Sequence, residues 1–356
     1  MPTLWFCIVA VMLTAYVLLD GFDLGVGIIH LIAARSDSER STMIRSIGPV
    51  WDGNEVWLLA AGGTLYFAFP GLYASGFSGF YLALMIVLWL LMLRGIAVEF
   101  RSHIRHQMWG SFWDIVFSGA SLLLAIFYGT ALGNVVRGVP LDKDGYFFVP
   151  LWTTFRTGPE PGILDWYTVM VGVAALFVLT MHGALWINLK TCGKLQETAR
   201  RIASTVYWAV CAAVVAITVC SFLVQPQLEK RFTAYPLLWV FPLLAAFGLL
   251  LLRLALSASL HFWAFIGSAL FIAGLLCSAA FGLFPLLLPS SGDASLSLTV
   301  LNSAAPDYGL SAGLKWWIPA FALAVTYSVL VYRHFRGKVL IPREGSDAEF
   351  ASAAGD

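Results

Sequence analysis

Nine long apolar segments constrain the fold of this chain more than any other feature of its sequence. A helix needs about 20 apolar residues to cross a hydrocarbon layer of about 30 Å, and lipid leaves only helices and closed barrels as ways to satisfy the backbone. Charged residues make up 12% of the chain, against about 25% in an average soluble domain. The sequence therefore predicts an all-α polytopic membrane protein with nine transmembrane helices. The segments cover approximately residues 4–33, 53–70, 75–99, 113–136, 163–189, 203–224, 235–256, 260–288 and 314–333.

Lys and Arg are distributed unevenly between the two sets of segment ends. Fifteen of the 21 lie at one set of ends and six at the other. Because positive residues are retained on the cytoplasmic side, we expect a periplasmic N-terminus and a cytoplasmic C-terminus. The first segment lacks the charged start and the cleavage site of a signal peptide, so we expect it to remain a membrane helix. The chain has no basic patch of the kind that nucleic acid needs, so we expect no nucleic-acid partner.

A weak internal sequence repeat predicts that the chain has two similar halves. His30 precedes Arg35 at the end of the first segment, and His182 precedes Lys190 at the end of the fifth. We expect two four-helix bundles followed by one peripheral helix. The predicted parts are a first bundle, a periplasmic loop, a second bundle, a second periplasmic loop with the ninth helix, and a cytoplasmic tail, at residues 1–138, 139–162, 163–289, 290–335 and 336–356.

Two carboxylates lie three residues apart inside the first apolar segment. Asp20 and Asp23 are roughly 25–28 Å from its start if the helix rises about 1.5 Å per residue. This places them on one helix face in the cytoplasmic half of the membrane, where a carboxylate is costly and usually faces protein or water. Gly21 and Gly25 form a small-xxx-small pair, which predicts the close approach of another helix.

A second acidic cluster begins the second segment, in the sequence Trp51-Asp52-Gly53-Asn54-Glu55. Asp52 follows an interfacial Trp, and Asp52 and Glu55 fall on the same side of the membrane as Asp20 and Asp23. Four carboxylates in a medium of low dielectric constant repel one another and can hold and release protons near neutral pH. One interpretation is a proton path from the cytoplasm. The alternatives are a satisfied polar network between the two helices, or Asp52 as a helix N-cap.

Charged residues around the third segment have a structural interpretation. Arg94 and Glu99 are five residues apart in its cytoplasmic half, and we expect them to support the acidic cluster, by pairing with each other or by reaching the carboxylates of the first helix. Arg101 is expected in a solvated positive loop. Asp114 is expected to be an interfacial or capping residue.

The histidines make a poor case for haem or metal binding in this chain. A cytochrome bundle with two haems needs two facing His pairs, and of the six His only His30 and His182 lie well inside apolar segments. A lone His in a membrane helix usually bonds to a neighbouring group. The five cysteines show no metal-ligand spacing and are interpreted as small buried hydrophobes. We therefore expect no metal and no cofactor bound by this chain alone.

Two long motifs at a fixed separation carry a family resemblance. Leu19–Gly27 (LDGFDLGVG) and Trp51–Leu58 (WDGNEVWL) resemble subunit II of the cytochrome bd-type quinol oxidases. The Leu before DGFD and the short outer loops resemble the cyanide-insensitive branch of that family. Shorter matching elements are Gly62-Gly63, Phe77–Tyr81 (FSGFY), Arg94, Phe100–Ser102 (FRS), Gly133-Asn134 and Arg137–Pro140 (RGVP).

The resemblance implies a subunit of a respiratory complex in the bacterial inner membrane. In the family, subunit I holds the haems, two of b type and one of d type or b type in its place, together with the quinol-binding loop. The complex oxidises quinol and reduces O2 to water with cytoplasmic protons. Subunit II binds no haem, although some members hold a structural quinone, such as ubiquinone, and some complexes include a small single-helix third subunit. The carboxylate that matches Asp52 is assigned a proton-conducting role at the subunit interface, with Asp23 and Asp20 nearby.

Two other functions remain open from the residues alone. A proton-coupled secondary transporter would also use intramembrane carboxylates and helices broken by Gly. A free-standing cytochrome b would use the histidines as haem ligands. Substrate flux by the purified chain would indicate the former, and a Soret band of the isolated chain would indicate the latter.

Overall fold

The structure, a computed structural model, describes residues 1–104 and 106–339. Within these residues, eight helical stretches are long and apolar enough to cross a membrane. They are α1 (Pro2–Ala33), α5 (Tyr81–Phe100), α6 (Gln107–Arg137), α7 (Trp166–Lys190), α8 (Gly193–Val224), η1 with α10 (Pro236–Trp239 and Val240–Ser257), α11 (His261–Leu283) and α12 (Asp307–His334). The all-α membrane fold is therefore confirmed.

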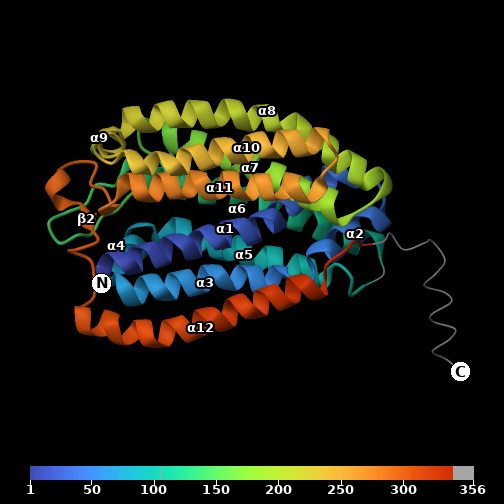
Figure 1. The fold of residues 1–356 in the computed structure, drawn as a ribbon, viewed down its shortest axis with the longest axis horizontal. Coiled ribbons are helices and arrows are strands. Elements are labelled where there is room, and N and C mark those ends of the chain that lie inside the picture. Colours follow the sequence, from blue (N-terminus) through green and yellow to red (C-terminus); the bar gives the residue numbers. More distant parts are fainter. Residues whose placement is uncertain (105, 340–356) are drawn as a thin grey trace, which may run out of the picture.

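The remaining predicted segment, residues 53–70, forms α3 (Trp51–Ala68). Its 18 residues rise about 27 Å, and it lies alongside the longer helices (Figure 1). It is less apolar than the others because its first turns carry Asp52, Asn54 and Glu55. The count of nine transmembrane helices stays a prediction that depends on whether α3 crosses completely.

Two boundaries differ from the predicted ones. The sequence Pro70-Gly71 between the second and third apolar segments predicts a tight turn, and this prediction is wrong, because Pro70 starts a short helix, α4 (Pro70–Gly79), and α5 follows from Tyr81. Proline suits the first helical position, where its missing N–H has no helical partner. The segment 260–288 ends as a helix at Leu283, since Pro285 cannot continue it, and the chain then forms the strand β1 (Leu286–Leu288).

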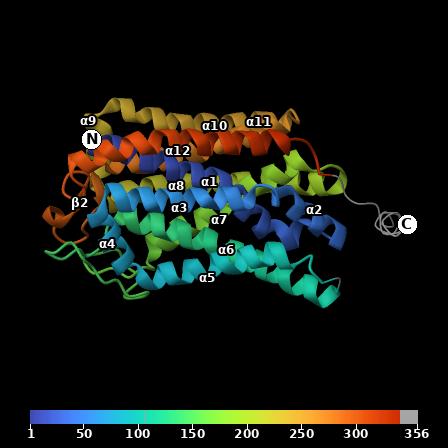
Figure 2. The same ribbon diagram turned by 90° about the horizontal axis from the view of Figure 1, so that it is seen from below.

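Short elements close the two ends of the bundle. At one end, called the α2 end here, α2 (Asp37–Ile47) joins α1 to α3, with the Ser36 side chain accepting a hydrogen bond from Glu39 N. At the other, the loop end, β1 pairs antiparallel with β2 (Leu298–Thr299). Also short are α9 (Pro226–Ala234) and η2 (Ala294–Leu296). The N-terminus lies at the loop end and α12 finishes at the α2 end (Figures 1 and 2). Which end faces the cytoplasm stays a prediction from the charge distribution.

The centre of the molecule is the contact between α1 and α7, the first helix of each predicted half. A Cβ built on Gly25 would lie 2.0 Å from Leu179 O and 2.6 Å from Gly183 N, so only glycine allows this approach. In Figure 1, α8 and α10 lie above α1, and α3 and α12 lie below it, while α11 contacts both α1 and α7. α12 packs on α3 through contacts such as that between Phe321 and Trp57. The division into bundles at 138 and 163 stays a prediction, and most of the predicted tail lies outside the described residues.

Candidate functional site: a buried acidic cluster

Arg94 joins carboxylates from two other helices inside the bundle. Its Nη1 donates a hydrogen bond of 2.5 Å to Asp20 Oδ1 on α1, and its Nη2 donates one of 3.1 Å to Glu55 Oε2 on α3. Arg94 and Asp20 are buried, whereas the side chain of Glu55 is 22% exposed. The planar guanidinium suits this use because it presents several donors in a fixed geometry. Three helices are thus tied together at one depth.

Asp23 has a neutral partner on the same two helices. Asn54 Nδ2 donates to Asp23 Oδ2 at 2.7 Å and lies 3.2 Å from the carbonyl oxygen of Leu19. The hydroxyl of Tyr332, near the end of α12, donates to Asn54 Oδ1 at 2.8 Å. Asp23 and Asn54 are buried. A hydrogen-bonded chain therefore runs from Tyr332 through Asn54 to Asp23.

The helical periodicity of α1 explains why its two acidic residues face α3 and α5 while its glycines face α7. Asp20 and Asp23 are three residues apart and share a face. Gly25 meets the backbone of α7, whereas a Cβ on Gly21 would lie 3.0 Å from the flexible end of the Leu179 side chain and 3.9 Å from the side chains of His182 and Val17. The expected close contact thus exists at Gly25, while Gly21 has more room.

The cluster has unused hydrogen-bonding capacity. Asp20 Oδ2, Asp23 Oδ1 and Arg94 Nε are buried and have no hydrogen-bond partner among the described residues. Asp20 and Glu55 share the Arg94 guanidinium, while Asp23 is held by the neutral Asn54. The arrangement can therefore accept or release a proton at Asp23 while the Asp20–Arg94 pair stays intact.

Three of the predicted site residues lie away from this cluster. Asp52 is exposed on α3, and its predicted role as an N-cap is wrong because Val50 occupies that position. Glu99 is exposed and does not pair with Arg94, so of the two alternatives given for Arg94 the structure shows the one that reaches the first helix, at Asp20. Five residues correspond to about 500° around a helix, so the two side chains point to different faces. Trp51 packs beside Gly95 of α5, where a built Cβ would lie 3.4 Å from its ring.

A second charged cluster at the α2 end was not predicted. Asp114 of α6 is buried and accepts hydrogen bonds from Arg101 Nε at 2.5 Å and Arg40 Nη1 at 3.4 Å, and it lies 2.6 Å from His30 Nε2. Arg101 also bonds to Asp37 of α2 at 2.5 Å. Arg101 is thus mostly buried rather than solvated, and Asp114 is an ion-pair centre rather than a cap. Only the tertiary fold brings these residues together, although an Asp well inside an apolar helix was a usable signal.

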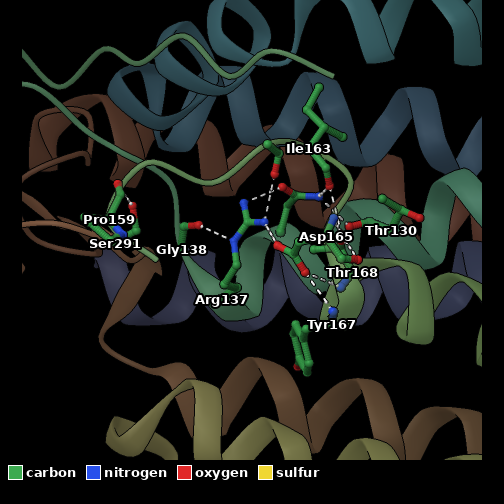
Figure 3. A network of polar contacts seen from close by, with 11 residues as sticks. Thr130, Arg137, Gly138, Pro159, Ile163, Asp165, Tyr167, Thr168 and Ser291 are labelled. Atoms are coloured by element: carbon green, nitrogen blue, oxygen red, sulfur yellow. Dashed lines mark hydrogen bonds and ion pairs between the residues drawn. The ribbon is translucent and has the colours of Figure 1, made fainter. Parts of the chain in front are cut away.

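A third cluster of charged and polar residues connects the helices at the loop end (Figure 3). Arg137, the last residue of α6, forms an ion pair with buried Asp165 and donates to Gly162 O at 2.9 Å. Asp165 in turn caps α7, accepting from Tyr167 N at 2.8 Å and Thr168 N at 2.9 Å. The cluster joins the end of α6 to the start of α7 across the intervening loop, and we interpret it as structural.

The membrane histidines are engaged with neighbouring groups, as expected. His182 lies 2.7 Å from Ser268 Oγ through Nδ1 and 3.0 Å from Leu18 O through Nε2, so both ring nitrogens are occupied. His30 bonds to Asp114. Among the described residues, no group of three or more His, Cys, Asp or Glu side chains is arranged to hold a metal ion. Neither ring nitrogen of His182 is therefore free to ligate a haem iron in this arrangement.

Comparisons with known proteins agree on one family. The family model described as "Cytochrome bd terminal oxidase subunit II" matches residues 1–335. The chain is 33% identical to the probable cytochrome oxidase subunit 2 of Haemophilus influenzae, with 94% of each chain covered. It is 32% identical to the cytochrome bd ubiquinol oxidase subunit 2 of Bacillus subtilis, covering 94% of this chain and 96% of that one. A chain in the structure of bd oxidase from Geobacillus thermodenitrificans shares its fold, with a TM-score of 0.76, 15% identity and coverage of 94% and 98%.

Proposed function

We infer the role of this chain from its family, because it belongs to the cytochrome bd terminal oxidase subunit II family. It is a subunit of a respiratory quinol oxidase and a multi-pass protein of the bacterial inner membrane. The transporter alternative is not favoured. Relatives such as the cytochrome bd-I ubiquinol oxidase subunit 2 of Escherichia coli, 30% identical, point to quinol and O2 as the substrates of the complex.

We propose that the exposed face of α3 receives the haem-bearing subunit I. Asp52 is exposed there, and a carboxylate facing lipid would be costly. A Cβ built on Gly62 or Gly63 would meet nothing within 4 Å, while Leu59 and Tyr66 nearby are 73% and 63% exposed. Small residues beside large exposed apolar ones suit close packing of a partner helix. On this arrangement the chain scaffolds subunit I and places Asp52 at the interface.

We further propose that the acidic cluster delivers protons for the reduction of O2. Asp23 and Asp20 lie inside the bundle on the side of the α2 end, which carries most of the positive charge and is predicted to be cytoplasmic. Uptake from that side would make the reaction electrogenic. Asp52 and Glu55, three residues apart on α3, would connect the cluster to the interface with subunit I.

The haems belong to the partner in this proposal. The family implies two b-type haems and a d-type haem, or b-type haems only, in subunit I, and these would supply the electron transfer from quinol to O2. The occupied nitrogens of His182 support a haem-free role for this chain. A bound ubiquinone and a small third subunit stay predictions.

The observation that carries the proposal is the buried Asp23, hydrogen-bonded to Asn54 beside the Asp20–Arg94 pair. The test is steady-state O2 consumption by the purified complex with the substitution Asp23→Asn. We expect co-purification with a haem-bearing partner, unchanged haem spectra and turnover reduced about tenfold or more. Unchanged turnover in an intact complex would remove the acidic cluster from the proton path.

A further inference from the structure

A cavity lies at the α2 end, between α2, α7 and α12 and beside the residues that precede α3. Its volume is about 130 Å³, enough for several water molecules. Arg45 and Ser46 of α2 line it, together with Lys190 at the end of α7. Lys190 is largely buried, and its Nζ donates to Phe335 O at 2.7 Å, leaving further N–H donors free to bind water. Apolar side chains, including Trp186 and Phe335, line the rest of the cavity, so water would be held through Arg45, Ser46 and Lys190.

A smaller cavity continues toward the acidic cluster. Its volume of about 10 Å³ is near the limit for a single water molecule. It shares Pro49, Val50 and Tyr332 with the larger cavity, so the two adjoin. Its other lining residues include Asn54 and Ser328. Space for water thus extends from the α2 end to the amide that holds Asp23.

We propose that protons reach Asp23 through these two cavities, and that Tyr332 and Asn54 are positioning residues at the inner end of this path. The inference rests on the proposed function and extends it. Tyr332 lines both cavities and fixes the orientation of the Asn54 amide, so that Nδ2 points to Asp23 Oδ2. Asp23 Oδ1, without a hydrogen-bond partner in the described part of the chain, is left to receive the proton.

The chemistry is a proton transfer without change of oxidation state. Asp23 lines neither cavity, and Asn54 lies between it and the inner end of the path. A hydronium ion that passes the Asn54 amide transfers its proton to Asp23 Oδ1, which forms an O–H bond and leaves a neutral water. Oδ2 keeps its hydrogen bond from Asn54 throughout. The path is lined by residues of this chain, so it differs from a path along exposed Asp52, which needs residues of the partner subunit.

A bulky residue in the smaller cavity tests the path. Ser328 is half-buried on α12, and Ser328→Phe would fill the space beside Asn54. In the intact complex we expect O2 consumption to fall at least about threefold and the H2O/D2O rate ratio to rise, because proton delivery becomes rate-limiting. The matched control is Thr326→Phe, which adds the same ring at an exposed position two residues away. We expect that variant to keep the rate and isotope ratio of the unaltered complex.

A second variant keeps the inference testable if Ser328→Phe prevents assembly. Tyr332→Phe preserves the ring and removes only the hydroxyl that holds Asn54. We expect slower turnover with a raised isotope ratio and unchanged haem content. If Asp23→Asn slows turnover but the assembled Ser328→Phe or Tyr332→Phe complexes behave like unaltered protein, the cavity path is wrong and the acidic cluster keeps its role. If Asp23→Asn has no effect, the proposed function itself fails.

Discussion

Arg94 on α5 and Asp20 on α1 form a buried ion pair, with 2.5 Å between Nη1 and Oδ1. Neither side chain is more than 1% exposed. Because Arg94 also holds Glu55, this one guanidinium fixes the positions of α1, α3 and α5 relative to one another. It also compensates part of the negative charge beside Asp23, so the carboxyl group proposed to carry protons lies next to a fixed positive charge.

Removing Arg94 should therefore reduce the stability of the complex more than it reduces the rate of the reaction. In Arg94→Met, Asp20 would be left buried without its cation, and losing one partner of such a pair costs about 3–5 kcal/mol. We expect a much lower yield of intact complex. The double variant Arg94→Met with Asp20→Asn should recover part of the yield, because no unpaired charge remains. Equal yields for the single variant and the unaltered chain would contradict the assigned pairing.

The α1–α7 contact predicts different outcomes at two glycines that look alike in the sequence. Gly25→Ala would place a Cβ 2.0 Å from a backbone oxygen of α7, whereas the Cβ of Gly21→Ala would meet side chains alone, the nearest being the flexible end of Leu179 at 3.0 Å. We expect Gly25→Ala to lower the unfolding temperature of the detergent-solubilised complex clearly and Gly21→Ala to change it little. Similar shifts for both variants would show that the helices are not in contact at Gly25.

The Asp114 cluster should stabilise the α2 end far more than an exposed ion pair does. Asp114→Leu leaves Arg101 largely buried without its main partner, and we expect a loss of about 3–5 kcal/mol. The matched comparison is Glu197→Gln, which breaks the exposed Arg201–Glu197 pair and should cost about 0.5 kcal/mol or less. Thermal denaturation of the complex measures the stability lost in each variant. Comparable losses for Asp114→Leu and Glu197→Gln would argue against the cluster's role.

Asp52 should affect turnover without affecting the fold. It is exposed and makes no hydrogen bond through its side chain within the described residues, so Asp52→Asn should leave assembly and haem spectra intact. If Asp52 lies at the interface with subunit I, O2 consumption should still slow. Turnover equal to that of the unaltered complex would remove Asp52 from the proton path and leave only the route inside this chain.

The helices and the acidic residues of α1 could be predicted from the sequence because apolar length and helical periodicity are local properties. Asp20 and Asp23 had to share a face, whatever packed on it. The sequence left two alternatives for Arg94, and the structure shows the one that reaches Asp20 of the first helix. Its second partner Glu55 and the partners of Asp114 could not be predicted, because they come from helices whose mutual rotation is set by tertiary packing. The same limit explains why Asp52, grouped with Asp20 and Asp23 by its depth in the membrane, lies on the exposed side of α3.

The central claim is that Asp23 carries protons taken up from the cytoplasm, and single-turnover proton uptake tests it most directly. The fully reduced complex is mixed with O2 in the presence of a pH-sensitive dye, for Asp23→Asn and for the control Asp144→Asn, an exposed carboxylate at the loop end. We predict that Asp23→Asn slows proton uptake about tenfold or more, with haem spectra unchanged, while Asp144→Asn has no effect. Uptake at the unaltered rate in the Asp23→Asn complex would contradict the claim.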